Sequence, residues 1–317
     1  MNFFVYIHIY IYIYIYIYVC MYTYRYLALK IFIKKANFVC TFMMVHDSFV
    51  QSMFMLIFKK IFIADNLATI VGQIYEPRTF VGGPGILIGM YAFTFQIYGD
   101  FSGYSDIARG LARWMGVELM ENFRLPLWAV SPRDLWHRWH ISLSQWLRDY
   151  LYIPLGGNRK GSTQRNLLMT MILGGLWHGA NWTFIVWGTL HGLALLFQHQ
   201  FFPKGPQSVP TRLLGVLLTF HLTAFCFLIF RAHSLSQVYS FLELPWRWAV
   251  EDPQRIRQFL VVVLPLLGIE AITRFRDDPF WPLKLPPLLQ AIFYLLLFGI
   301  TLILGASFGQ QFIYFQF

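Results

Sequence analysis

The chain has 317 residues, enough for one or two domains, and its composition differs sharply from that of a soluble protein. Hydrophobic residues make up 57% of the chain and charged residues only 13%, whereas soluble domains contain about 45–50% and about 25%. The mean hydropathy is +0.51. So few charged groups cannot cover a water-facing surface. The composition therefore indicates an integral membrane protein and excludes intrinsic disorder, a coiled coil and a secreted disulfide scaffold.

The formal net charge is +10, from 25 basic and 15 acidic residues, and the basic residues are scattered through short connections. Nucleic-acid binding requires a clustered basic face, so we expect no nucleic-acid partner. Scattered basic residues are typical of loops anchored at anionic lipid headgroups. The three cysteines imply neither a disulfide framework nor a cysteine-based metal site; they are Cys20, Cys40 and Cys226.

The N-terminal stretch differs from the rest, because residues 9–18 are five consecutive Ile-Tyr pairs. Strict alternation with period two is typical of a β-strand. A DNA tract of alternating A and T also reads Ile-Tyr-Ile-Tyr when translated. The stretch lacks the basic region and the small-residue cleavage site of a signal peptide. We therefore expect residues 1–48 to be a low-complexity extension outside the functional domain, either non-functional or a mispredicted start.

Apolar stretches alternate with short polar connections in the remainder of the chain. Residues 49–75 are apolar apart from three charged side chains, which indicates a helix that lies at an interface or packs on protein. Residues 86–98 are apolar but too short to span a bilayer, and they lead into the polar sequence GDFSGYSD at 99–106. Polar groups at that depth must be satisfied by protein or by a water-filled cavity.

The second half of the chain is more uniformly apolar. Residues 167–198 predict either one long tilted helix or two shorter helices broken near Gly179. Three cleaner spans follow, each close to the ~20 residues that a helix needs to cross a bilayer. They are residues 213–230, 258–273 and 287–306.

Residues 121–165 combine charges, indoles and imidazoles in a way that is costly inside a bilayer, so we expect them at an interface or around a cavity. Ser131-Pro132 is a good helix start. On a helix beginning there, Arg133, His137 and His140 would share one face at i, i+4 and i+7.

Three motifs in order resemble those of the membrane-bound O-acyltransferase superfamily, and within it the alginate O-acetyltransferase branch. They are GDFSGYSD at 99–106, WHISLSQWLRDY at 139–150 and GLWHGANW at 175–182, with FIYFQF at 312–317 as a closing element. The D-alanyl transferase branch shares the Trp-His elements, but the LGGNR turn at 155–159 is more similar to the alginate branch.

The resemblance implies an all-α, polytopic transmembrane helical bundle with re-entrant or interfacial helices around a central tunnel. It covers residues 49–317, which would form the C-terminal part of the family domain of a multi-pass protein in the inner or plasma membrane. Family members carry several more transmembrane helices before the position of Phe49. This chain also has His137 where arginine is common.

His178 is the main catalytic candidate, because acyl transfer to a hydroxyl needs a base near neutral pH and histidine suits that task. The resemblance places the most characteristic histidine of the superfamily at this position. The alternative is a core histidine bonded to a neighbouring carbonyl. Asn181 would orient the ring, donate to an oxyanion or simply cap a helix. Trp177, within the same motif, is expected to support the site.

His140 is the second catalytic candidate, since the resemblance implies that it shares the cavity of His178 and positions the acceptor or relays a proton. The alternative is an interfacial histidine between tryptophans. Arg148 and Asp149 of the same motif are expected to support the site. Asp106 is expected to pair with Arg109 at i+3. We expect no metal site, because no H-E-x-x-H motif is present.

The resemblance thus implies transfer of an acetyl group from a cytoplasmic thioester to hydroxyls of an extracytoplasmic, alginate-like polysaccharide. The donor would be acetyl-CoA or an acyl-carrier thioester, with no tightly bound cofactor. The partners would be membrane lipid, the polysaccharide acceptor and accessory acetyl-transfer proteins. Three alternatives remain open: transfer of D-alanyl or another acyl group, an inactive fragment, and a transporter, which inverted repeats would favour.

Overall fold

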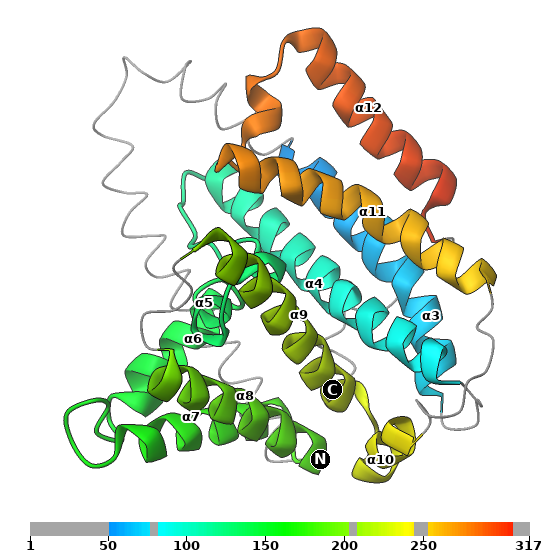
Figure 1. Cartoon of the computed structure of the whole chain (residues 1–317). Helices are drawn as coiled ribbons and strands as arrows, with labels where there is room; N and C mark the ends of the chain where they lie inside the picture. Colours follow the sequence, from blue (N-terminus) through cyan, green and yellow to red (C-terminus); the bar gives the residue numbers. More distant parts are fainter. Residues whose placement is uncertain (1–50, 77–81, 203–207, 244–252, 307–317) are drawn as a thin grey trace, which may run out of the picture.

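A computed structural model describes residues 51–76, 82–202, 208–243 and 253–306, and every regular element within these residues is helical (Figure 1). The expected all-α fold class is therefore confirmed for this part of the chain. Residues 1–48, for which a separate extension was predicted, lie outside the described residues. The elements are η1 (Phe58–Ala64), α3 (Asp65–Tyr75), α4 (Gly83–Trp114), η2 (Pro126–Trp128), α5 (Pro132–Trp136), α6 (Ile141–Leu147), η3 (Arg148–Tyr152), α7 (Thr163–His178), α8 (Trp182–Phe201), α9 (Val209–Arg231), α10 (Leu235–Glu243), α11 (Pro253–Arg276), η5 (Trp281–Lys284) and α12 (Pro287–Leu304).

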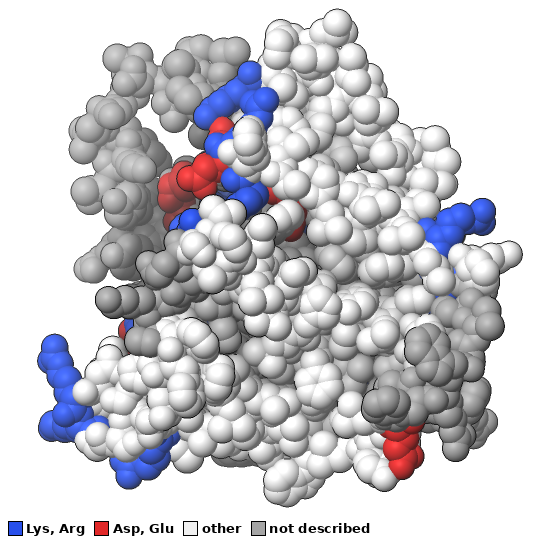
Figure 2. All heavy atoms as spheres, viewed as in Figure 1, with Lys and Arg blue, Asp and Glu red and all other residues white. Residues whose placement is uncertain are grey.

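Three of the described helices, α9, α11 and α12, are long and apolar enough to cross a membrane, which confirms the three spans expected near these positions. Large apolar side chains on their outer faces are exposed, among them Leu217, Leu264 and Ile303. Figure 2 shows a face that is largely uncharged, with charged side chains confined to a few places. Such a surface is typical of a protein that faces lipid.

Helices α4 and α9 lie side by side through the middle of the molecule and join its two groups of helices (Figure 1). On one side α4 packs against η1 and α3, and α11 contacts all three. On the other side α8 packs against α9, and α7 pairs with α8. The buried core runs through this central contact, so residues of α4 and α9 are placed to face both groups.

The first described segment is helical from residue 51 through η1 and α3, and it is deeply buried, with Phe58, Phe62 and Leu67 at 0% exposure. The expectation that residues 49–75 form a helix packed on protein is therefore confirmed for the described part. Lys60 Nζ lies 2.9 Å from Asp65 and 2.8 Å from Asp100, so one cation serves two buried carboxylates. Such pairing is what allows charges to persist in an apolar interior.

Helix α4 contains residues 86–106 and corrects one expectation about them. The apolar stretch does not end before the polar motif, because one 32-residue helix runs through both. Asp106 pairs with Lys59 at 2.6 Å rather than with Arg109. Gly99 allows α4 to approach η1 closely, since a Cβ there would lie 3.0 Å from the Lys59 carbonyl oxygen. The motif thus supplies carboxylates to a neighbouring helix instead of interrupting its own.

Helices α7 and α8 form a tight hairpin, and of the two arrangements left open for residues 167–198 the structure has two helices, with the break at Gly179. Their backbones touch at glycines. A Cβ on Gly175 would lie 2.2 Å from the Phe184 carbonyl oxygen, and one on Gly188 would lie 2.3 Å from the Met171 carbonyl oxygen. Small residues at these crossing points allow contact that any side chain would prevent.

The helix that starts at Ser131-Pro132 is much shorter than expected. Ser131 caps it as expected, by accepting from the Asp134 N–H, but α5 ends at Trp136 after five residues. A second short helix, α6, begins after His140, whose φ of 43° is left-handed. The expected shared helical face of Arg133, His137 and His140 is therefore wrong, because the helix ends before His137 and the backbone at His140 is left-handed.

Candidate active site

His140 and His178 line one small cavity at the centre of the molecule, which we call the histidine pocket. It has a volume of about 10 Å³, room for roughly one water-sized group. Six helices, α4 to α9, and the residues between α5 and α6 contribute to it, so the pocket depends on the arrangement of all six. Its lining residues are Ile97, Trp136, Trp139, His140, Leu143, His178, Trp187, Phe227 and Phe230.

His178 is the last residue of α7 and is held within a cage of aromatic rings. Its ring lies 4.9 Å from that of Trp177, 5.2 Å from that of Trp187 and 5.1 Å from that of Phe230, each in an edge-on arrangement. The carbonyl end of a helix stabilises positive charge by about 0.3–1 kcal/mol. This position therefore favours an imidazole that has just accepted a proton.

His140 is 9% exposed and caps α6 through its own ring. The Leu143 backbone N–H donates to its Nδ1 at 3.4 Å, and the Ser142 hydroxyl lies 3.3 Å from the same atom. An accepting Nδ1 leaves the proton of the neutral ring on Nε2. Burial lowers the pKa of His140 to about 3. The ring is therefore neutral at physiological pH and suited to donating from Nε2 rather than to carrying charge.

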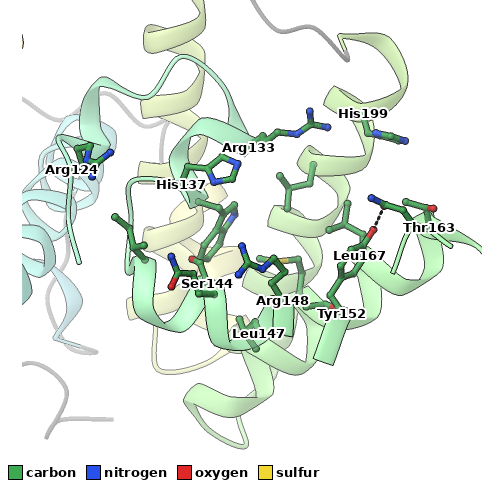
Figure 3. A pocket seen from close by; sticks show the side chains of 17 residues that line it. Arg124, Arg133, His137, Ser144, Leu147, Arg148, Tyr152, Thr163, Leu167 and His199 are labelled. Atoms are coloured by element: carbon green, nitrogen blue, oxygen red, sulfur yellow. Dashed lines mark hydrogen bonds between the residues drawn. The ribbon is translucent and has the colours of Figure 1, made fainter. Parts of the chain in front are cut away.

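A larger cavity of about 850 Å³, the basic cleft, lies on the other side of Trp136, which lines both cavities. Figure 3 shows Arg133 and His199 along one edge of it, with Arg148 and Tyr152 along another. Its three lining arginines favour an anionic ligand, although Arg124 pairs with Glu121 at 2.6 Å and Arg148 pairs with Asp149 at 2.7 Å. The lining residues are Arg124, Arg133, Trp136, His137, Ile141, Ser144, Gln145, Leu147, Arg148, Tyr152, Asn158, Thr163, Leu167, Thr170, Met171, Leu195 and His199.

Arg148, expected to support the histidine site, lines the basic cleft instead, and Asp149, expected beside it, lines neither cavity. The Arg148 guanidinium donates to both carboxylate oxygens of Asp149, at 2.7 and 3.1 Å. Hydrogen bonding to Arg148 holds the pKa of the Asp149 carboxyl below its usual range. Exposed pairs of this kind contribute little to stability. Arg148 therefore belongs to the lining of the cleft rather than to the histidine pocket.

Asn181 uses both ends of its amide in the described structure. Its Oδ1 accepts from the Thr183 N–H at 3.1 Å and caps α8, while Nδ2 donates to the His233 carbonyl at 3.2 Å. It is not among the residues that line the histidine pocket. Capping explains this arrangement, and a catalytic role for Asn181 stays a prediction. No group of three or more His, Cys, Asp or Glu side chains within the described ranges is arranged to hold a metal.

Sequence reasoning missed Trp187 and Phe230, which complete the cage around His178. It also missed His199 and the grouping of three arginines in the basic cleft. A signal for Trp187 was present, because it lies four residues after Thr183 and four before His191, and all three are buried. That spacing marks one face of a helix.

Comparison with known proteins places these features in a family. The model of the membrane-bound O-acyltransferase family matches residues 2–212. That range includes most of residues 1–48, whose separation from the functional domain stays a prediction.

Among similar proteins, the probable alginate O-acetylase AlgI of Pseudomonas putida is 50% identical over 181 residues, which are 56% of this chain and 36% of that protein. AlgI of Pseudomonas aeruginosa is 47% identical over 234 residues, 70% of this chain and 44% of that protein. The peptidoglycan O-acetyltransferase of Helicobacter pylori is 38% identical over 192 residues, 59% of this chain and 36% of that protein. The chain thus matches less than half the length of each relative. With two thirds of its residues inside the family match, and with the histidines of two of the family-like motifs lining one pocket, the chain belongs to the membrane-bound O-acyltransferase family.

Proposed function

We propose that this protein transfers an acetyl group from a thioester to a hydroxyl group of a polysaccharide. The observation that carries the proposal is the histidine pocket, in which His140 and His178 meet although they lie in separate elements of the chain. Relatives that are 47–50% identical are named probable alginate O-acetylases, which supports an alginate-like acceptor. The pocket also lies beside a cleft suited to an anionic ligand.

In the proposed mechanism His178 is the general base. It takes the proton of the acceptor hydroxyl while the oxygen attacks the thioester carbonyl carbon. The tetrahedral intermediate then collapses and the C–S bond breaks. The leaving thiolate takes the proton from His178. The position of His178 at the end of α7 supports this role, because the helix stabilises the imidazolium between the two steps. The acceptor is either the polysaccharide itself or an intermediate carrier.

The neutral His140 is proposed to position the acceptor by donating a hydrogen bond from Nε2. The donor, acetyl-CoA or an acyl-carrier thioester, carries phosphate groups, and these would bind the arginines of the basic cleft. Trp136 lines both cavities, so a thioester reaching from the cleft to His178 would pass this side chain. A continuous central tunnel is part of the same proposal.

The proposed setting is the inner or plasma membrane, where lipid surrounds α9, α11 and α12 and accessory acetyl-transfer proteins complete the reaction outside. A half-buried candidate base beside a second histidine supports an enzyme more than a transporter, and Trp136 lines both their pocket and the basic cleft.

The proposal is tested with the purified chain in lipid nanodiscs, using acetyl-CoA labelled in the acetyl group and oligomannuronate as acceptor. We expect labelled acetyl ester on the oligosaccharide, released by mild alkali. D-alanyl-carrier thioester offered in parallel tests the donor. Folded protein that transfers neither group, to this acceptor or to water, would overturn the proposed activity for this chain.

A further inference from the structure

Two tryptophans of the histidine pocket have indole N–H groups that do not donate to any residue the structure describes. They are Trp136, the last residue of α5, and Trp187 on α8, and Nε1 of each is buried. A buried donor without an acceptor is destabilising. Most buried donors are paired, so each exception needs an explanation. Two such donors on one cavity indicate that a bound ligand would supply the acceptor.

The geometry brings both indole rings to the pocket where the reaction would occur. The Trp136 and Trp187 ring centroids lie 5.9 Å apart at 77°, and the Trp187 ring lies 5.2 Å from that of His178 at 88°. Trp187 is only 4% exposed. The cavity they line has room for about one water-sized group. A carbonyl oxygen is a group of that size.

The pocket contains the base and lacks another obvious source of charge stabilisation. Lys and Arg are absent from its lining residues, and its remaining wall is aromatic or aliphatic. In such a dry site, neutral N–H donors that are already oriented stabilise a developing oxyanion without reorganisation. Indole Nε1–H is a donor only, so it does not compete with the thioester as an acceptor.

We propose that the indole N–H groups of Trp136 and Trp187 form the oxyanion site, donating hydrogen bonds to the carbonyl oxygen of the acyl thioester. The inference rests on the proposed function. When the acceptor oxygen attacks, the carbonyl π-electron pair moves onto this oxygen, and the two N–H groups bind it more strongly than they bind the ground-state carbonyl. When the C–S bond breaks, the pair returns to re-form the carbonyl of the ester and the thiolate takes the proton from His178.

The test replaces each indole with a ring that lacks the N–H, in Trp187→Phe and Trp136→Phe. Loss of one oxyanion donor lowers kcat by about 100–1000-fold. We expect that loss in kcat for each variant, with KM for the donor near that of wild type. The matched control is Trp281→Phe, since this buried indole donates to Thr273 at 3.1 Å, away from the pocket. The control should lose some thermal stability and keep its kcat.

A second measurement needs neither turnover nor a folded variant. In wild-type protein labelled with ¹⁵N-tryptophan, the indole resonances of Trp136 and Trp187 should shift downfield when acetyl-CoA is added, and the Trp281 resonance should not. Variants that keep the wild-type kcat, or indole resonances that do not respond to bound donor, would overturn the inference. If both indoles instead hold one permanent water, their resonances stay unchanged on donor addition, which also overturns it. Absence of transfer by wild type overturns the proposed function separately.

Discussion

The glycine contact between α7 and α8 sets the distance between His178 and Trp187, so its disturbance should damage both stability and catalysis. In Gly188→Ala the new Cβ would lie 2.3 Å from the Met171 carbonyl oxygen and 3.3 Å from the Gly175 Cα. Ordinary contact needs about 3.4 Å, so the helices must separate by about 1 Å. Overpacking of this kind costs about 1–3 kcal/mol. A displacement of about 1 Å at a catalytic pair costs up to about 100-fold in rate.

Thermal unfolding in detergent measures the first effect and acetyl transfer per folded protein measures the second. Each kcal/mol corresponds to about 2–4 °C in a protein of this size, so we expect Tm to fall by about 2–12 °C. The matched control is Gly299→Ala, because a Cβ there meets nothing within 4 Å. It should keep its rate and gain up to about 1 kcal/mol. A Gly188→Ala protein as stable and as active as Gly299→Ala would refute the backbone contact.

Three further changes test other parts of the structure. Lys60→Met removes the cation that Asp65 and Asp100 both contact, so it should destabilise the fold by about 3–5 kcal/mol, measured as lost folded yield and Tm. Asn181→Ala removes the α8 cap and should lower stability by about 1 kcal/mol while transfer per folded protein is kept; a loss of transfer at unchanged stability would instead indicate catalysis. Burial lowers the pKa of His140 to about 3 from an ordinary 6.5, so the unfolded chain binds the proton first. Stability should therefore fall as pH drops below about 6.5, and His140→Gln should reduce that slope by up to about 1.4 kcal/mol per pH unit, leaving the share of His191, whose pKa burial also lowers to about 3; an unchanged slope would contradict the burial of His140.

The apolar helices could be predicted from the sequence, because lipid-facing helices need long runs of apolar residues. The three spans and the helix of residues 49–75 followed from that requirement. The break at Gly179 was one of two alternatives, and a glycine next to two polar side chains pointed to the right place.

The ion pairs and helix ends of the polar segments were harder to predict, because they depend on tertiary contacts. Asp106 pairs with Lys59 of a neighbouring element, although Arg109 is closer in sequence. The helix at Ser131 stops after five residues, and His140, a little further along the chain, adopts a left-handed φ, which is uncommon for any residue other than glycine although histidine is enriched in it. A non-glycine residue held in that region costs about 1–3 kcal/mol and is found most often at functional sites.

The candidate site was predictable in part. The motifs singled out His140 and His178, and the structure brings them to one pocket. The aromatic cage and the unpaired indoles could not be derived, because they depend on which faces of α5 and α8 meet. Arg148 and Asp149 were expected at the same site because they share a motif with His140, whereas helix α6 lies between them and His140, and Arg148 lines the basic cleft.

The central claim is that His178 acts as the general base, and a single substitution tests it most directly. His178→Gln keeps the size and polarity of the side chain but cannot accept a proton near neutral pH. General base catalysis contributes about 10²–10⁴-fold, so acetyl transfer per folded protein should fall by at least two decades while Tm stays near wild type. His221→Gln is the matched control, since this exposed histidine bonds only to the Leu217 carbonyl among the described hydrogen bonds. Turnover in His178→Gln equal to that of His221→Gln would contradict the account.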